Sequence, residues 1–152
     1  PYIQKFHSSE YINALANGDV CVAVGWSGDI LQARDRAAEA DNGVEIAYNA
    51  PSEGAQMWFD QMAIPVDAPN PDGAHVFLNF IMDAQNMAAA SNYVYYANGN
   101  KASQEFLAED VIGDTAIYPD EATLKNLYTI SSYSPKVQRV ITRMWTKIKS
   151  GI

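Results

Sequence analysis

The sequence has few of the residues on which metal sites and catalytic dyads are built. It contains one cysteine, Cys21, and two histidines, His7 and His75, among 152 residues. These three residues do not have the short, regular ligand spacing of a zinc site. The sequence also lacks a glycine-rich phosphate loop ending in Lys-Ser/Thr and the dinucleotide-binding fingerprint. It therefore predicts neither a metal nor a cofactor.

Positive charge and long apolar runs are scarce as well. Residues 1–133 contain 5 Lys and Arg against all 18 Asp and Glu, and the other 5 basic residues follow in 134–152. An acidic body argues against nucleic acid as a partner and favours cationic ligands. No run approaches the roughly 18 apolar residues of a membrane-spanning helix, and no signal peptide is visible at the start. Because the chain begins with Pro1, we expect either that its start has been processed or that it is a fragment.

The pattern that is present alternates apolar runs with helical spacing, which is typical of an α/β fold. A break at 51–54, where proline and glycine flank a short polar run, is a candidate hinge or domain crossing. Apolar runs predict strands over 20–24, 44–48 and 57–64. Helical spacing and capping residues predict helices over 8–17, 30–40, 70–81, 83–91, 121–126 and 134–148, with another beginning near Lys101. A serine is expected to cap the first helix, and Gly18 to take the left-handed position at its end. The helices over 70–81 and 134–148 each carry an apolar stripe, and the stripe of the former is expected to be buried: Ala74, Phe77, Leu78 and Ile81.

Two aromatic–carboxylate pairs lie on or beside the predicted strands. Trp26 and Asp29 occupy a tight glycine turn after the first strand, where ligands bind in open α/β sheets. Trp58 and Asp60 share one face of the third strand, and Tyr96 belongs to a further aromatic cluster. Taken singly, Trp26 fits a core residue, Asp29 a helix cap and Tyr96 a loop cover. Their repetition favours an alkylammonium ligand, because carboxylates and aromatic ring faces both bind such cations.

Two other function classes remain open from the residues alone. A hydrolase acting on amines or amides would use Ser27 or the carboxylates, although Asp29 stands where a nucleophile elbow requires glycine. Such an enzyme requires a nucleophile and a base within hydrogen-bond reach. An interaction module without a small ligand would instead bury Trp26 and Trp58 and tie Asp29 and Asp60 to the protein's own groups. The cysteine in the first strand fits either a buried apolar group or half of a disulfide with chain outside this sequence.

Four segments resemble bacterial periplasmic polyamine-binding proteins, which serve ABC importers of putrescine and spermidine. They are residues 17–29, Trp58-Phe59-Asp60, Tyr95-Tyr96-Ala97-Asn98 and 143–151. The resemblance implies a periplasmic-binding-protein type II fold: two α/β lobes joined by hinge crossings, with the ligand between them. It covers only the C-terminal part of such a receptor. It implies that residues 1–46 belong to the second lobe, 47–105 to the first lobe, and 106–152 to the second lobe again.

The same resemblance implies roles for individual residues. Trp26 and Asp29 become ligand-binding residues of the second lobe, and Trp58, Asp60 and Tyr96 those of the first. Trp58 stands where putrescine receptors are associated with phenylalanine, so the choice between putrescine and spermidine stays open. The cysteine matches one that is disulfide-bonded to a cysteine in the missing N-terminal half. We therefore expect a periplasmic receptor, not an enzyme, that delivers a polyamine to an ABC transporter permease.

Overall fold

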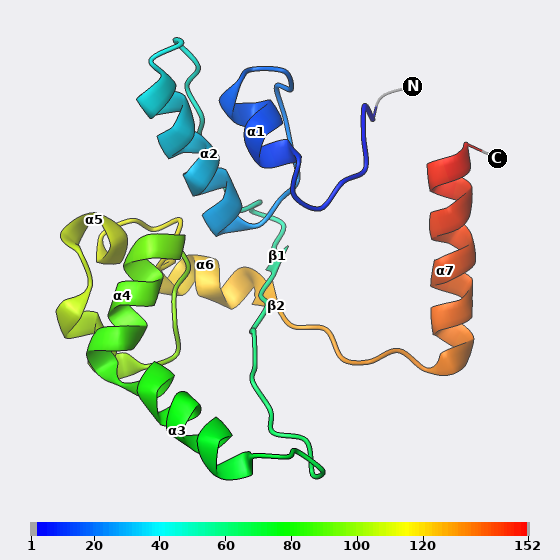
Figure 1. The fold of residues 1–152 in the computed structure, drawn as a ribbon. Helices are drawn as coiled ribbons and strands as arrows, with labels where there is room; N and C mark the ends of the chain where they lie inside the picture. The colour runs from blue at the N-terminus through cyan, green and yellow to red at the C-terminus, as the bar shows by residue number, and fades with distance from the viewer. Residues whose placement is uncertain (1–2, 152) are drawn as a thin grey trace.

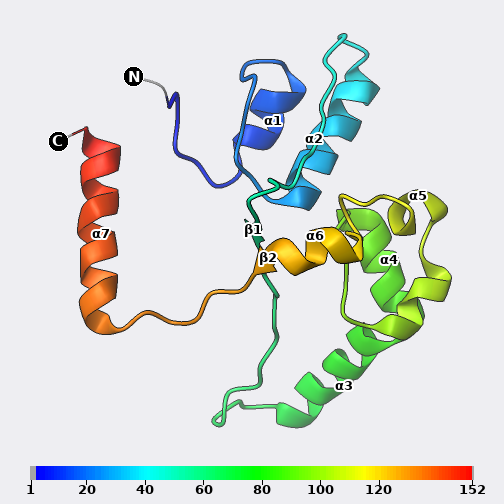
Figure 2. The same cartoon turned by 180° about the vertical axis from the view of Figure 1, so that it is seen from behind.

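Helices make up most of the regular structure, and one short sheet lies among them. The computed structural model describes residues 3–151. Figures 1 and 2 show α1 and α2 on one side of the short sheet, α3 to α6 on another, and α7 standing apart from both groups. The elements are α1 (Tyr11–Ala16), α2 (Ser27–Ala40), β1 (Ala55–Gln56), α3 (Pro71–Met82), α4 (Ala84–Val94), the 3₁₀ helix η1 (Lys101–Phe106), α5 (Glu109–Ile112), α6 (Glu121–Asn126), β2 (Leu127–Tyr128) and α7 (Pro135–Ser150).

Most helix starts lie where the capping residues predict them. The Asn70 side chain accepts the backbone N–H of Gly73 at 3.0 Å, and Ser134 accepts that of Val137 at 3.4 Å. Asp83 caps α4 through two backbone N–H groups. These bonds satisfy donors that have no partner inside their own helix. The predicted starts near 70, 83, 121 and 134 are therefore confirmed.

The predicted serine cap of α1 is wrong. The N-cap residue is Glu10, and it makes no side-chain capping bond. Instead, His7 Nδ1 accepts the backbone N–H groups of Ser9 (3.1 Å) and Glu10 (2.9 Å). The predicted left-handed residue after this helix is confirmed, because Gly18 has φ 78°.

The three predicted strands are not strands in the described chain. Residues 20–24, 44–48 and 57–64 run outside any sheet, and Val24 is fully exposed where a doubly covered strand would bury it. A strand needs a neighbour for its backbone N–H and C=O groups. Within residues 3–151 the only strand pairing is that of β1 with β2.

The β1–β2 pair is parallel and joins segments far apart in the chain. Ala55 pairs with Leu127 and Gln56 with Tyr128. The residue before β1, Gly54, has φ 112°, and a Cβ there would lie 2.5 Å from the Asn126 carbonyl oxygen. The proline–glycine break predicted at 51–54 thus leads directly into the pairing, which needs glycine for both conformation and space.

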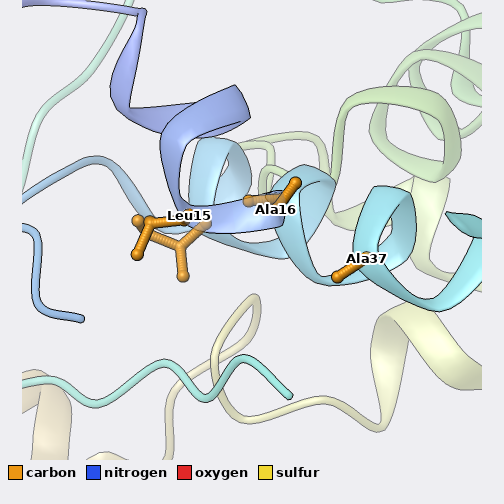
Figure 3. Packing of buried hydrophobic residues seen from close by; sticks show 5 residues of the cluster. Leu15, Ala16 and Ala37 are labelled. Atoms are coloured by element: carbon orange, nitrogen blue, oxygen red, sulfur yellow. The ribbon is translucent and has the colours of Figure 1, made fainter. Parts of the chain in front are cut away.

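The core consists of two small clusters that share α2. In the first, Leu15 and Ala16 of α1 pack against three residues of α2, as Figure 3 shows in part. The α2 residues of this cluster are Ile30, Ala33 and Ala37. In the second, Leu31 of α2 packs against Val111 and Ile117. Helix α2 therefore has one face on α1 and another on the α5 region, which fixes the position of its N-terminus.

Two predicted apolar faces are largely uncovered. The stripe of Ala74, Phe77, Leu78 and Ile81 was expected to be buried, but α3 has no buried residue and Phe77 is 55% exposed. All of α7 is exposed. Its Trp145 ring makes an edge-on contact with the ring of Phe6, with ring centroids 5.0 Å apart. The expectation failed because the described chain places no layer over these faces.

Among residues 3–151, none of the helices has both the length and the apolar content that crossing a bilayer requires.

Candidate functional site

The candidate site is built at the N-terminus of α2. Trp26 is the N-cap residue with an extended backbone (φ −77°, ψ 143°), and its side chain makes no capping bond. Asp29 follows in the first turn. The first N–H groups of a helix lack partners within it and carry the positive end of the helix dipole. This end therefore favours a carboxylate and needs acceptors from elsewhere in the chain.

Two tyrosine hydroxyls supply these acceptors and also donate to Asp29. Tyr11 of α1 donates to Asp29 Oδ2 and accepts the backbone N–H of Trp26 at 3.2 Å. Tyr96, just after α4, donates to Asp29 Oδ1 at 3.1 Å and accepts the backbone N–H of Asp29 at 3.3 Å. Both carboxylate oxygens are thus engaged. An ionised carboxylate has about four acceptor positions, so two remain for a ligand.

Two glycines give the tyrosines room to reach the helix end. A Cβ on Gly25 would lie 2.5 Å from Cε2 of Tyr11, and a Cβ on Gly28 would lie 2.5 Å from Cδ2 of Tyr96. Real Cβ atoms do not approach other carbons so closely. The glycine spacing around Trp26 therefore serves close packing by two aromatic rings.

The surroundings keep both hydroxyls protonated. Burial raises the pKa of Tyr11 to about 12, and its hydrogen bond to Asp29 adds to the effect. Burial, followed by the negative charge of Asp29, raises the pKa of Tyr96 far above its usual value. A tyrosine is already neutral near pH 7, and the raised pKa values keep these two side chains neutral hydrogen-bond donors into the alkaline range.

The two predicted aromatic–carboxylate pairs meet through their indole rings. The centroids of Trp26 and Trp58 are 6.3 Å apart, with ring planes inclined at 54°. Trp58 Nε1 donates to Asp60 Oδ1 at 3.2 Å, which orients the second indole. Trp26 is 48% exposed and Trp58 58% exposed. The structure therefore brings Trp58 to Trp26 and Tyr96 to Asp29, and it leaves much of both indoles accessible.

The two alternative functions considered from the sequence, an interaction module and a hydrolase, can be compared with the structure. The interaction-module interpretation predicts that both indoles are buried, and this prediction is wrong. Its second prediction, that Asp29 and Asp60 bond to the protein's own groups, is confirmed. For a hydrolase, Ser27 is the first residue of α2, and in the described part of the chain no hydrogen bond links it to a histidine. His7 Nδ1 instead binds the backbone before α1.

Sequence reasoning missed Tyr11. Its place in a short predicted helix gave no sign that it contacts Asp29, eighteen positions away. The one signal was Gly25, whose missing side chain leaves space for a ring. The cysteine of the first predicted strand is exposed, so its interpretation as a buried apolar group is wrong. Its pairing with another cysteine stays a prediction.

Comparison with known proteins gives a consistent set of relatives. The family model described as bacterial extracellular solute-binding protein matches residues 2–119. The putrescine-binding periplasmic protein SpuD of Pseudomonas aeruginosa is 51% identical over 151 residues. The putrescine-binding periplasmic protein PotF of Escherichia coli is 48% identical over the same length. In both cases the match covers 99% of this chain and 41% of the relative.

Solved structures agree with these relatives. The spermidine/putrescine ABC transporter substrate-binding protein PotD of Streptococcus pneumoniae superposes with a TM-score of 0.71 at 28% identity. The superposition covers 93% of this chain and 42% of that protein. A spermidine/putrescine ABC transporter protein of Listeria monocytogenes gives a TM-score of 0.66 over 91% of this chain and 47% of its own. The chain thus spans less than half the length of the relatives that it matches.

Proposed function

Because the chain belongs to the bacterial extracellular solute-binding proteins and has their type II periplasmic-binding fold, we propose that it forms part of a polyamine receptor. The receptor binds putrescine or spermidine between two lobes in the periplasm and delivers it to the permease of an ABC importer. The carrying observation is that two half-exposed indoles and the Asp29 carboxylate lie at one helix end. The proposal involves no covalent chemistry.

The side chains suit the chemistry of a polyamine. Trp26, Trp58 and Tyr96 offer rings that attract an ammonium group and enclose the methylenes between amines, each ring contributing about 0.5–2 kcal/mol. Asp29 and Asp60 accept charge-assisted hydrogen bonds, each worth about 1.5–3 kcal/mol. Micromolar binding requires about 8 kcal/mol in total, which lies within the combined range of these five groups in a site closed to water.

The lobe assignment expected from the sequence is part of the proposal. Residues 1–46 and 106–152 would belong to the second lobe, and 47–105 to the first. Packing of Leu31 against Val111 supports this division, because it joins the two second-lobe ranges. The ion pair between Arg34 and Asp114, at 3.2 Å, joins the same ranges. Under this assignment the β1–β2 pair links the first lobe to the second, close to the expected crossing near 47, and the rest of each lobe comes from an N-terminal half outside this chain.

The site assignment also remains a proposal. Trp26 and Asp29 form the second-lobe wall, and Trp58, Asp60 and Tyr96 the first-lobe wall. The contacts of Trp58 with Trp26, and of Tyr96 with Asp29, support placing these walls face to face.

Calorimetry of the full-length receptor with putrescine and with spermidine tests the proposal. We expect the Asp60→Asn variant to bind either ligand at least roughly tenfold more weakly, because it loses a charged acceptor. Asp67→Asn, an exposed acid in the loop before α3, is the matched control and should bind as the parent does. Unchanged affinity in Asp60→Asn would show that the site has been misplaced. A parent protein that binds neither polyamine would refute the proposed function itself.

A further inference from the structure

Tyr11 lies behind the ligand-facing side chains of the proposed site, on a different helix. We propose that Tyr11 is a positioning residue for polyamine binding, because its hydroxyl fixes the Asp29 carboxylate and the Trp26 backbone in their binding arrangement. This inference rests on the proposed function and adds a residue to it.

The two hydrogen bonds of Tyr11 have a defined direction. A phenol has one proton, and this proton is donated to Asp29 Oδ2. The oxygen in turn accepts the N–H of Trp26 at 3.2 Å. One hydroxyl therefore connects the carboxylate proposed to bind an amine with the backbone of the indole proposed to cover it. Loss of this hydroxyl would free both groups at once.

The ring of Tyr11 is itself held firmly. It packs against the cluster in which Leu15 of α1 meets Ile30 and Ala33 of α2. Gly25, on the chain entering α2, leaves the space that the ring occupies. Helices α1 and α2 thus form one packed unit, and the Tyr11 hydroxyl projects from it onto Asp29. A carboxylate held in this way needs little further ordering when a ligand binds, which increases affinity.

The raised pKa of Tyr11 is consistent with this role. With a pKa of about 12, the phenol remains a donor wherever the receptor operates. The opposite oxygen of Asp29 is held by Tyr96. Because Tyr96 lies in the proposed first lobe and Tyr11 in the second, Tyr11 is the partner that stays with Asp29 when the lobes separate.

A double-mutant cycle in the full-length receptor tests this role. The four proteins are the parent, Tyr11→Phe, Asp29→Asn and the double variant, each titrated with putrescine and spermidine up to millimolar concentration. Phenylalanine keeps the ring against Gly25 and removes only the hydroxyl. We expect Tyr11→Phe to weaken binding roughly tenfold in the parent and less than about twofold in the Asp29→Asn background. Tyr93→Phe, at a position that is 83% exposed, controls for removal of a phenol as such.

The outcomes separate the two proposals. A parent that binds neither polyamine overturns the proposed function together with this inference. A parent that binds while Tyr11→Phe binds equally well overturns the inference alone. An equal loss in both backgrounds also overturns it, because the hydroxyl would then act through the Trp26 backbone or the fold alone and would not position Asp29. Thermal unfolding of each variant shows whether the fold has changed.

Discussion

The hydroxyl of Tyr96 bonds twice to Asp29, although the two residues are 67 positions apart in the chain. It donates to the carboxylate at 3.1 Å and accepts the backbone N–H of the same residue at 3.3 Å. A side chain from the segment after α4 thereby completes the first turn of α2. If the lobe assignment is correct, this contact crosses between the lobes, and its formation is coupled to their closure.

Replacing Gly28 with alanine should weaken polyamine binding. The new methyl group would overlap the Tyr96 ring, which must then move away from Asp29. Alanine is at the same time the better helix former by about 1 kcal/mol, so we do not expect α2 itself to weaken. Calorimetry should show a loss of roughly tenfold or more in affinity. Gly99→Ala is the matched control, because no atom lies within 4 Å of a Cβ there. Equal affinities of the two variants would contradict the role given to this contact.

Stability should fall in strongly alkaline solution through the two tyrosines that bond to Asp29. The pKa of Tyr11 is raised to about 12 and that of Tyr96 is raised further in the same direction, whereas a tyrosine in the unfolded chain titrates near 10. The folded protein therefore keeps protons that the unfolded chain releases. These groups leave stability unchanged below about pH 10 and reduce it as pH rises from there through 12.

This pH dependence can be measured by thermal unfolding across the alkaline range, together with the ultraviolet absorbance of tyrosinate. Tyr11→Phe should flatten the fall in stability and remove one late-titrating phenol. If the variant loses stability with pH as steeply as the parent does, Tyr11 is not one of the late-titrating groups.

Gly54→Ala should destabilise the fold by about 1–3 kcal/mol. Gly54 has φ 112°, a conformation that is strained for alanine, and the added methyl group would meet the Asn126 carbonyl. Gly43→Ala is an informative control, because Gly43 also has positive φ (77°) but no atom lies within 4 Å of its Cβ position. Denaturant unfolding of both variants separates the conformational cost from the cost of the contact. A smaller effect at Gly54 than at Gly43 would contradict the close approach of β1 and β2.

The helices could be predicted from the sequence because their signals are local. Asn70 before Pro71 and Ser134 before Pro135 each define a helix start within a few residues, and both starts are confirmed. The strands could not be predicted in the same way. An apolar run such as 20–24 shows what a strand would bury, but a strand also needs a neighbour, and none is present for it among residues 3–151.

The same distinction between local and long-range signals applies to the candidate site. The aromatic–carboxylate pairs around Trp26 and Trp58 could be recognised from residue types, and the family resemblance agreed with them. The contact of Tyr11 with Asp29 depends on how α1 packs against α2. The spacing of apolar residues within each helix does not predict how the two helices pack. The ranges assigned to each lobe remain predictions.

The pairing of β1 with β2 also bears on the order in which the chain folds. The two strands are separated by the whole of α3 to α6, so bringing them together closes a long loop, at an entropic cost that short-range contacts do not carry. Helices capped by neighbouring residues form from local contacts, whereas this pairing must wait until the intervening chain is compact. We therefore expect β1 and β2 to join in a late, slow step, so that this link between the proposed lobes is completed after the helices on either side of it.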